Sequence, residues 1–294
     1  MNHPKLKLAQ EAIEAKGWWG AHRYLLLRRL SQLTILLLFL IGPWFGWWLV
    51  KGNLNYSLTL DVLPLADPLV LLQSLLARHV PERNAIIGAL LVALFYLLVG
   101  GRAYCAWVCP VNIVTDAASA LRRTWDIRGG ADLPQATRYW ILGLILLLAA
   151  TSGGIVWELV NPVSMLPRGL LFGMGAGWLL IGGIFLFDLF VMKRGWCSHL
   201  CPVGAFYSLL GHWSLLRVSA VKREACNDCL DCFTICPEQQ VIKLPLKGAK
   251  KGIGPLILSG NCTNCGRCLD VCSKDVFSFT TRRHSTLSPV ETQS

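Results

Sequence analysis

The sequence predicts an α-helical polytopic membrane domain, with four transmembrane helices as two repeated hairpins, followed by a small α+β domain rich in cysteine. Three observations support this fold class. Of the 294 residues, 54% are hydrophobic and only 15% are charged, whereas soluble domains carry about a quarter of charged residues. The apolar residues gather in long uncharged runs. All twelve cysteines fall in four short motifs, which indicates ligands or redox groups.

Four apolar runs are long enough to cross a membrane, at about 1.5 Å of rise per residue. We predict spans at residues 30–50, 85–101, 139–160 and 170–192. Gly42-Pro43 predicts a kink in the first run. At the last run, Gly169, Gly173 and Gly177 stand four residues apart and predict a face for close helix packing.

The segments between the runs predict the topology. Residues 1–29 form a basic segment without a signal-peptide pattern. Asp61, Pro64 and Asp67 interrupt the next apolar stretch, which predicts an outer loop with an interfacial or re-entrant part around Leu69–Leu76. Only four of the 28 Lys and Arg residues lie in the predicted outer loops: Lys51, Arg78, Arg83 and Arg168. Because inner loops keep positive charge, both termini and every cysteine are expected to be cytoplasmic.

One cysteine motif repeats within the predicted membrane domain, residues 30–217. R-A-Y-C-A-W-V-C-P at residues 102–110 recurs as R-G-W-C-S-H-L-C-P at residues 194–202, an offset of 92. Asp67-Pro68 has a rough counterpart in Asn161-Pro162. The domain therefore reads as two hairpins that each end in C-x3-C-P, and functional sites of repeated membrane folds lie near the repeat interface.

The four cysteines of these motifs are Cys105, Cys109, Cys197 and Cys201. Cysteines at i and i+4 share one helix face, so the repeat could gather four thiols at the membrane surface. They could hold a further iron–sulfur cluster or another thiophilic metal, act as a reversible dithiol, or serve as small apolar residues. Their matched positions argue against the last interpretation, and the first two stay open.

A second kind of motif, C-x2-C-x2-C-x3-C, occurs at residues 226–236 and again at residues 262–272. This spacing is typical of bacterial two-cluster ferredoxins, in which the fourth cysteine ligates the other cluster. We expect one [4Fe–4S] cluster on Cys226, Cys229, Cys232 and Cys272. We expect the second on Cys262, Cys265, Cys268 and Cys236. Pro237 follows the first run, whereas Ser273 stands in the corresponding place of the second.

Other classes of protein explain these patterns less well. Structural zinc uses C-x2-C pairs or Cys with His, so a third cysteine at the same interval is not needed. A disulfide framework does not suit the reducing compartment in which clusters are assembled. The net charge of +11 could indicate nucleic-acid binding, but the basic residues flank the apolar runs and do not form an aromatic-rich basic patch.

The cysteine-rich domain is predicted at residues 218–283, with β-prone stretches at Val241–Leu246 and Leu256–Ser259. A domain of this length cannot build a large apolar core. Loss of its metal should therefore unfold it. Residues 284–294 are predicted to be a disordered tail.

Two ionisable residues are candidates for handling protons from a quinol. Asp188 lies in the last apolar run, and an intramembrane carboxylate is a functional candidate unless it snorkels to the interface. His199 lies inside the second C-x3-C and could take a proton or hold a thiol, or be a plain surface histidine. Glu158 and His79, on the predicted outer side, are weaker candidates.

Over nearly its full length the chain resembles the NapH family, the ferredoxin-type membrane subunits of the quinol-dehydrogenase module that serves periplasmic nitrate reductase. The matching stretches are K-G-W-W at 16–19, G-P-W-F-G at 42–46, D-P-L at 67–69, N-P-V-S at 161–164, residues 196–205 and both cysteine runs. The resemblance implies a multi-pass protein of the bacterial inner membrane with two [4Fe–4S] clusters and ubiquinol or menaquinol as electron donor. It also implies a periplasmic ferredoxin-type partner, NapG.

Two functions are therefore weighed. The first is an electron-transfer subunit of a quinol dehydrogenase; cytoplasmic clusters and a periplasmic acceptor would require electrons to cross back through the membrane domain. The alternative is a polyferredoxin-type assembly or regulatory factor for a copper or other respiratory metalloenzyme. Such relatives generally carry a large additional domain, whereas 29 residues precede the first predicted span and 22 follow Cys272.

Overall fold

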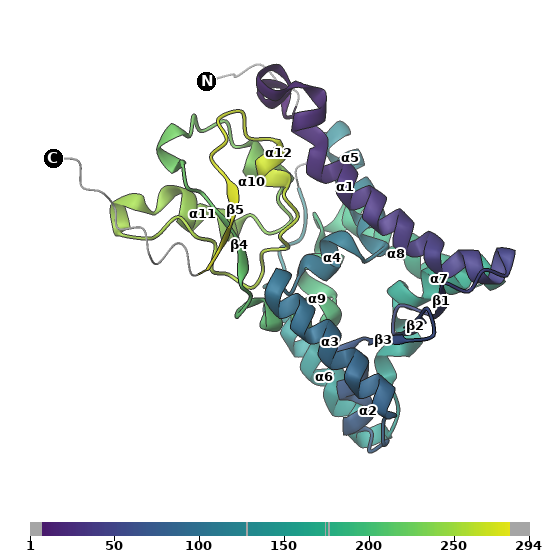
Figure 1. Cartoon of the computed structure of the whole chain (residues 1–294). Helices are drawn as coiled ribbons and strands as arrows, with labels where there is room; N and C mark the ends of the chain where they lie inside the picture. Colours follow the sequence, from purple (N-terminus) through teal and green to yellow (C-terminus); the bar gives the residue numbers. More distant parts are fainter. Residues whose placement is uncertain (1–7, 128, 174, 176, 283–294) are drawn as a thin grey trace. The chain divides into compact units, whose positions relative to one another are not determined.

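The computed structural model of the chain describes residues 8–127, 129–173, 175 and 177–282 (Figure 1). The chain divides into two compact units. The first comprises Met1–Leu30, Tyr96–Trp107 and Ser208–Ser294, and the second comprises Ser31–Phe95 and Val108–Tyr207. The first unit thus holds both C-terminal cysteine runs and Cys105. The predicted tail, residues 284–294, lies outside the described residues.

The N-terminal helix α1 (Gln10–Phe45) is the one helix among the described residues that is long and apolar enough to span a membrane. It begins well before the predicted span and ends at Phe45 instead of Val50, where a strand starts. The predicted kink at Gly42-Pro43 stays a prediction, with Pro43 inside the helix. Gly17 has a non-helical conformation within α1, at φ 74° and ψ 169°, which glycine adopts at little cost. Pro43 sits in the last turn, where little helix remains to be displaced.

The predicted outer loop contains regular structure. A three-stranded antiparallel sheet is formed by β1 (Val50–Gly52), β2 (Tyr56–Thr59) and β3 (Leu63–Ala66). Leu60 and Asp61 adopt positive φ between β2 and β3, so residues that look like strand breakers turn a hairpin. The predicted interfacial stretch is the helix α2 (Pro68–Leu76).

Three shorter apolar helices coincide with the remaining predicted spans. They are α3 (Arg83–Val99), α6 (Thr137–Ser152) and α8 (Gly177–Leu186), the last continued by the π-helix η2 (Phe187–Val191). The helix α6 stops before residue 160 because Gly153 caps it at φ 68°. A 3-10 helix, η1 (Val156–Val160), and α7 (Pro162–Phe172) follow. Gly173 ends α7 at φ 82°, so the predicted packing face of three glycines on one helix is wrong.

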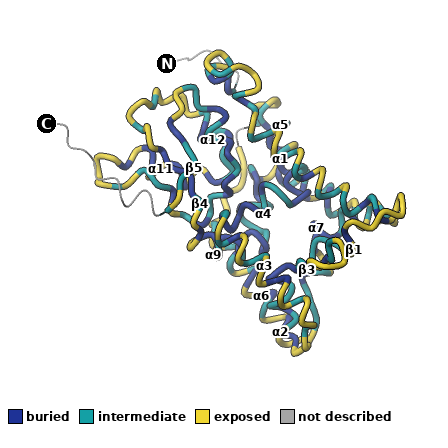
Figure 2. Tube along the Cα trace, viewed as in Figure 1, coloured by how far each residue is buried: buried dark blue, intermediate teal, exposed yellow. Residues whose placement is uncertain are grey.

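Large apolar side chains point outward from these helices. On α3 and α6 they include Leu90, Leu94, Trp140 and Leu147, all more than half exposed. Figure 2 shows exposed and half-buried segments along α1 and α3. Soluble monomers rarely expose apolar surface of this extent, so these helices need a covering environment.

The predicted two-fold repeat is visible in the helix starts and in the order of elements. Asp67 caps α2 by accepting the N–H of Leu69 at 2.8 Å, and Asn161 caps α7 by accepting the N–H of Val163 at 3.1 Å. Each half then runs through an apolar helix into a short helix and a further helix. These are α4 (Ala103–Trp107) with α5 (Val111–Thr124), and the π-helix η3 (Trp196–Leu200) with α9 (Pro202–Gly211).

The cysteine-rich part is α+β. Strand β4 (Leu216–Ser219) pairs antiparallel with β5 (Ser278–Thr281). The helices are η4 (Arg223–Ala225), α10 (Asp231–Ile235), α11 (Gln240–Lys247), η5 (Ala249–Lys251) and α12 (Arg267–Asp270). The predicted strand at Val241–Leu246 is wrong, because burial of Val241, Ile242 and Pro245 follows the helical period. Of the second predicted strand, only Leu256 makes a bridge, to Ser219.

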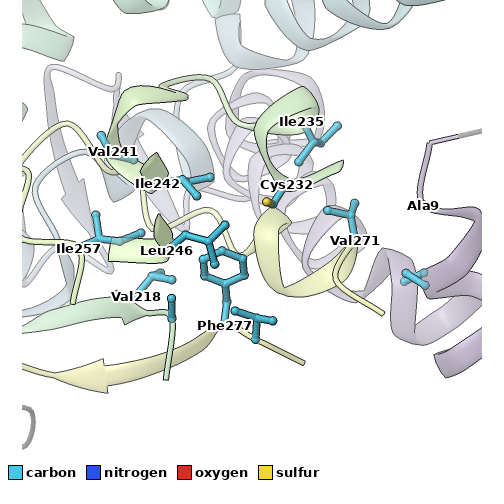
Figure 3. Packing of buried hydrophobic residues seen from close by; sticks show 14 residues of the cluster. Ala9, Val218, Cys232, Ile235, Val241, Ile242, Leu246, Ile257, Val271 and Phe277 are labelled. Atoms are coloured by element: carbon cyan, nitrogen blue, oxygen red, sulfur yellow. The ribbon is translucent and has the colours of Figure 1, made fainter. Parts of the chain in front are cut away.

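The core of this part is small and includes cysteine. Val218, Ile242, Ile257 and Phe277 are almost fully buried and pack together, with the sulfur of Cys232 among them (Figure 3). Other cysteines of both runs pack against the same cluster. The apolar core and the thiols therefore form one structure.

Candidate functional site

The two C-terminal cysteine runs adopt the same backbone conformation. Asp228 and Leu230 in the first run, and Asn264 and Gly266 in the second, all have φ between 46° and 70°. Each pair flanks the second cysteine of its run. Alternation of left-handed with other residues turns successive N–H groups to one side, and such concavities bind anions and iron–sulfur groups. Glycine is required at 266 because a Cβ would overlap the Tyr24 ring.

Each run contributes cysteines to two cavities. The first is lined by Cys226, Cys229, Cys232 and Cys272. The second is lined by Cys236, Cys262, Cys265 and Cys268. The last cysteine of each run thus lies with the first three of the other run.

The donor set of these cavities fits a polynuclear iron–sulfur group. All twelve cysteines are free thiols, and four soft donors surround each cavity. Among the described residues, no group of three or more His, Cys, Asp or Glu side chains is arranged as a site for a single metal ion. Apolar side chains complete both walls, including Phe233 and Leu246 in one and Val241 and Ile257 in the other.

Burial makes these thiols costly to ionise without a metal. It raises the pKa of Cys232 to about 12 and that of Cys262 to about 11. Coordination to a metal deprotonates a thiol outright. Occupancy of the cavities and stability of this part of the chain are therefore coupled.

The N-terminal helix is fixed to the second cysteine run within the first unit. The carboxylate of Asp270, on α12, accepts the N–H groups of Tyr24 and Leu25 at 3.0 Å each. Lys16 donates to the carbonyl of Leu269 at 3.1 Å. Helix α12 also carries Cys268, so α1 supports a wall of the second cavity.

The helix α4, which carries Cys105, is also held against this run. Arg102 forms a buried ion pair with Glu238 and donates to the carbonyl of Asn261 at 3.1 Å. Trp107 donates its indole N–H to the carbonyl of Asn264 at 3.1 Å. Glu238 and Asn261 lie close in sequence to two cysteines of the second cavity, Cys236 and Cys262. The segment with Cys105 is thus anchored beside the second cavity.

The C-x3-C-P motifs do not place both cysteines on one α-helix face, so that prediction is wrong. The helix α4 ends at Trp107 and η3 ends at Leu200, so Cys109 and Cys201 lie beyond them. Cys201 has φ −70° and ψ 114°, since a residue before proline is driven out of the helical region.

Each motif is supported by a buried arginine that the sequence reasoning missed. Arg28, on α1, donates to the carbonyl of Ala106 at 3.0 Å. Arg138, on α6, donates to the carbonyl of Ser198 at 3.1 Å. Both carbonyls belong to the residue after the first cysteine of a motif. The sequence signal that could have identified them is their position, because each arginine directly borders the first apolar run of its half.

Three motif cysteines belong to the second unit. Burial raises the pKa of the Cys197 thiol well above its usual range, and Asp188, Cys201 and Cys109 act in the same direction as negative neighbours. The hydroxyl of Thr115 lies 3.6 Å from the Cys197 sulfur. Cys109, Cys197 and Cys201 are therefore neighbours, while Cys105 belongs to the first unit.

Asp188 and His199 are not brought into one cavity. Asp188 is fully buried and accepts the N–H of Trp196 at 2.9 Å, so it supports the turn before Cys197 and does not snorkel. His199 lines an open cavity together with three basic side chains, Arg122, Arg123 and Lys193, and two acidic ones, Asp126 and Asp132.

The two outer candidates make contacts with segments far away in the sequence. Glu158 accepts a hydrogen bond from Asn55 at 2.5 Å and pairs with Arg168 at 3.3 Å. The ring of His79 lies 3.0 Å from the carbonyl of Gly153. Both are explained by loop structure.

Comparison with known proteins adds two kinds of similarity. A family model described as a 4Fe-4S dicluster domain matches residues 225–276, and one described as a 4Fe-4S binding domain matches residues 84–128 and 174–220. The chain is 51% identical over 282 residues to the ferredoxin-type protein NapH of Haemophilus influenzae, covering 96% of this chain and 97% of that one.

Two further relatives are similarly close. The NapH of Escherichia coli is 47% identical over 96% of this chain and 98% of its own. The methylamine utilization ferredoxin-type protein MauN of Methylorubrum extorquens is 53% identical over 95% of this chain and 96% of its own. No solved structure matches the chain.

Proposed function

Because the chain belongs to the NapH and MauN family of ferredoxin-type electron-transfer proteins, we propose that it is a membrane-bound subunit that takes electrons from a quinol. It passes them on through two [4Fe–4S] clusters. The observation that carries this proposal is the pair of four-cysteine cavities, each built from both cysteine runs.

The ligand sets follow the cavity walls. Cys226, Cys229, Cys232 and Cys272 hold one cluster. Cys262, Cys265, Cys268 and Cys236 hold the other. Such clusters supply one-electron carriers, while a quinol releases two electrons and two protons on becoming a quinone. Two clusters in one domain can therefore accept both electrons of one quinol in succession.

The four-span topology remains part of the proposal. Its supports are the long apolar helix α1, the three shorter apolar helices and their exposed apolar side chains. The distribution of Lys and Arg supports a cytoplasmic position for the termini and all cysteines.

The anchoring of α4 supports a route between the membrane helices and the clusters. Helix α4 follows α3 directly and is bonded, through Arg102 and Trp107, to residues beside the second cavity. Within the first unit, an electron that leaves the segment of Cys105 therefore meets the cluster of the second cavity first.

For the C-x3-C-P motifs, a third cluster is favoured over a dithiol. The family model described as a 4Fe-4S binding domain covers both motifs. Cys109 is buried, and Cys197 and Cys201 are half-buried beside each other, whereas reactive dithiols need access to their partners.

Among the proton-handling candidates, His199 is favoured over Asp188. It lines an open cavity that a quinol head group could enter. Asp188 is closed off and holds the Trp196 turn, so it acts as a positioning residue for Cys197.

The destination of the electrons has two candidates. By resemblance to NapH, they pass with a NapG-type periplasmic partner to periplasmic nitrate reductase. The equally high identity to MauN favours methylamine utilization as a second candidate. Expression of the full chain in strains lacking either NapH or MauN distinguishes the two, because only the matching system regains electron flow.

The deciding experiment is anaerobic purification of the full chain, followed by iron analysis, EPR and addition of a reduced quinol analogue. We expect about eight irons for two clusters, or about twelve with a third, and reduction of the signals by the quinol. Intact clusters that no quinol reduces, even with the partner subunit present, contradict quinol oxidation. Cys105→Ser and Cys197→Ser should lower iron content if the motifs hold a cluster; unchanged iron with lost electron flow indicates a dithiol.

A further inference from the structure

A buried arginine without a carboxylate partner lies beside the second cysteine cavity. Arg217 is on β4, next to Val218, which lines the cavity, and it is 2% exposed. Its guanidinium donates, at 2.5 to 3.2 Å, to the carbonyls of Gly211, His212, Ser214 and Ser259. Within the described part of the chain all its partners are such carbonyls, so no counter-ion neutralises its charge. Arginine stays charged even when buried.

A second buried arginine, Arg102, lies beside the same cavity. Arg102 donates to the carbonyl of Asn261, the residue before Cys262. The carbonyl of Ser259, to which Arg217 donates at 3.2 Å, also accepts the N–H of Cys262 at 3.2 Å. Glu238 neutralises Arg102 by an ion pair, which leaves Arg217 as the uncompensated positive charge.

The first cavity has the opposite surroundings. Asp231 precedes Cys232 in the chain, and Glu11 accepts a hydrogen bond from Asn227, which lines the first cavity. In the described residues these carboxylates accept only from neutral donors: Asn227, Ser273 and the N–H of Ala9. Cys229 is also exposed.

We propose that Arg217, with the carboxylates of Glu11 and Asp231, sets the order in which the two clusters are reduced, the second-cavity cluster accepting an electron first. This rests on the proposed ligand sets. Reduction adds one electron and makes a cluster more negative by one charge. A buried cation stabilises that form, carboxylates oppose it, and the low dielectric of the interior strengthens both effects.

Under this proposal, the two electrons of one quinol reduce the two clusters in a fixed order. The first stays on the cluster beside α4, and the second electron then fills the more exposed cluster, from which a partner can take it. Arg217 touches no reacting atom in this scheme and is a positioning residue for charge.

The test is an EPR-monitored redox titration of the full chain, with the two signals assigned through Cys229→Ser and Cys265→Ser. Arg217→Gln should lower the midpoint potential of the second-cavity cluster and leave the other unchanged. Arg217→Lys keeps the charge and should stay close to the parent protein. Lys243→Gln is the matched control, because it removes an exposed positive charge of the same unit, where solvent screens it.

A second variant covers the case in which Arg217→Gln fails to fold. Glu11→Gln should raise the midpoint potential of the first-cavity cluster and reduce the difference between the midpoint potentials of the two clusters. The inference is overturned if neither variant moves its own cluster, or if Arg217→Lys lowers the midpoint as far as Arg217→Gln. A parent protein with fewer than two cluster signals would instead refute the proposed cofactor content.

Discussion

At the residue scale, the last cysteine of each run distinguishes two cluster arrangements. Cys272 lines the cavity of the first run and Cys236 lines that of the second. If each run held its own cluster, Cys272 would line the second cavity and Cys236 the first.

Serine substitution separates the two arrangements. Cys272→Ser should perturb the same EPR signal as Cys229→Ser, and Cys236→Ser the same signal as Cys265→Ser, because a hydroxyl oxygen is a poorer ligand for iron–sulfur iron than a thiolate. Lys243→Gln, at an exposed position of the same unit, is the control and should leave both signals unchanged. A match between Cys272→Ser and Cys265→Ser would contradict the exchanged ligand sets.

At the element scale, the starts of α2 and α7 use related capping residues with different charge. Asp67 is buried, and burial raises its pKa to about 6 from a usual 3.8, with the charge of Glu158 adding to the rise and the N–H groups of Leu69 and Val70 opposing it. Asn161 caps α7 in the same way without a charge.

This difference predicts a pH dependence of stability. Between about pH 4 and 6 the folded chain holds more protons at Asp67 than the unfolded chain, so the free energy of unfolding falls as pH rises through this window. Asp67→Asn keeps the cap and removes the buried charge. Because the pKa of Asp67 lies about 2 above its usual value, Asp67→Asn should raise the free energy of unfolding by up to about 3 kcal/mol at pH 7. At pH 4 the rise should be small.

Thermal unfolding at both pH values measures the effect. The control is Asp67→Ala, which loses the cap and about 1 kcal/mol of that gain. An Asp67→Asn variant no more stable than the parent protein at pH 7 would show that the buried charge is not destabilising.

At the scale of the whole molecule, the predicted sidedness can be measured directly. Green fluorescent protein fused after the C-terminus should fluoresce, because it folds in the cytoplasm. Alkaline phosphatase inserted near His79, in the predicted outer loop, should be active. Expression level and membrane fractionation are the controls. An active phosphatase at the C-terminus would put the clusters outside and remove the need for electrons to cross back.

The sequence by itself determined the chemistry of this protein. Cysteine spacing predicted the first three thiols of each set, because that spacing is local, and the two-cluster ferredoxin pattern predicted that each fourth thiol comes from the other run, as the cavity walls have it. Hydropathy likewise located all four apolar helices, although α6 and α8 are shorter than the runs that contain them.

Only the tertiary structure decided which conformation some of these segments adopt and which distant side chains hold them. The strand predicted at Val241–Leu246 became a helix because its burial follows the period of the core, and proline moved Cys201 off its helix. Arg28, Arg138 and Arg217 act on carbonyls or thiols far away in the sequence. Such contacts have no sequence period, since they depend on which segments folding brings together.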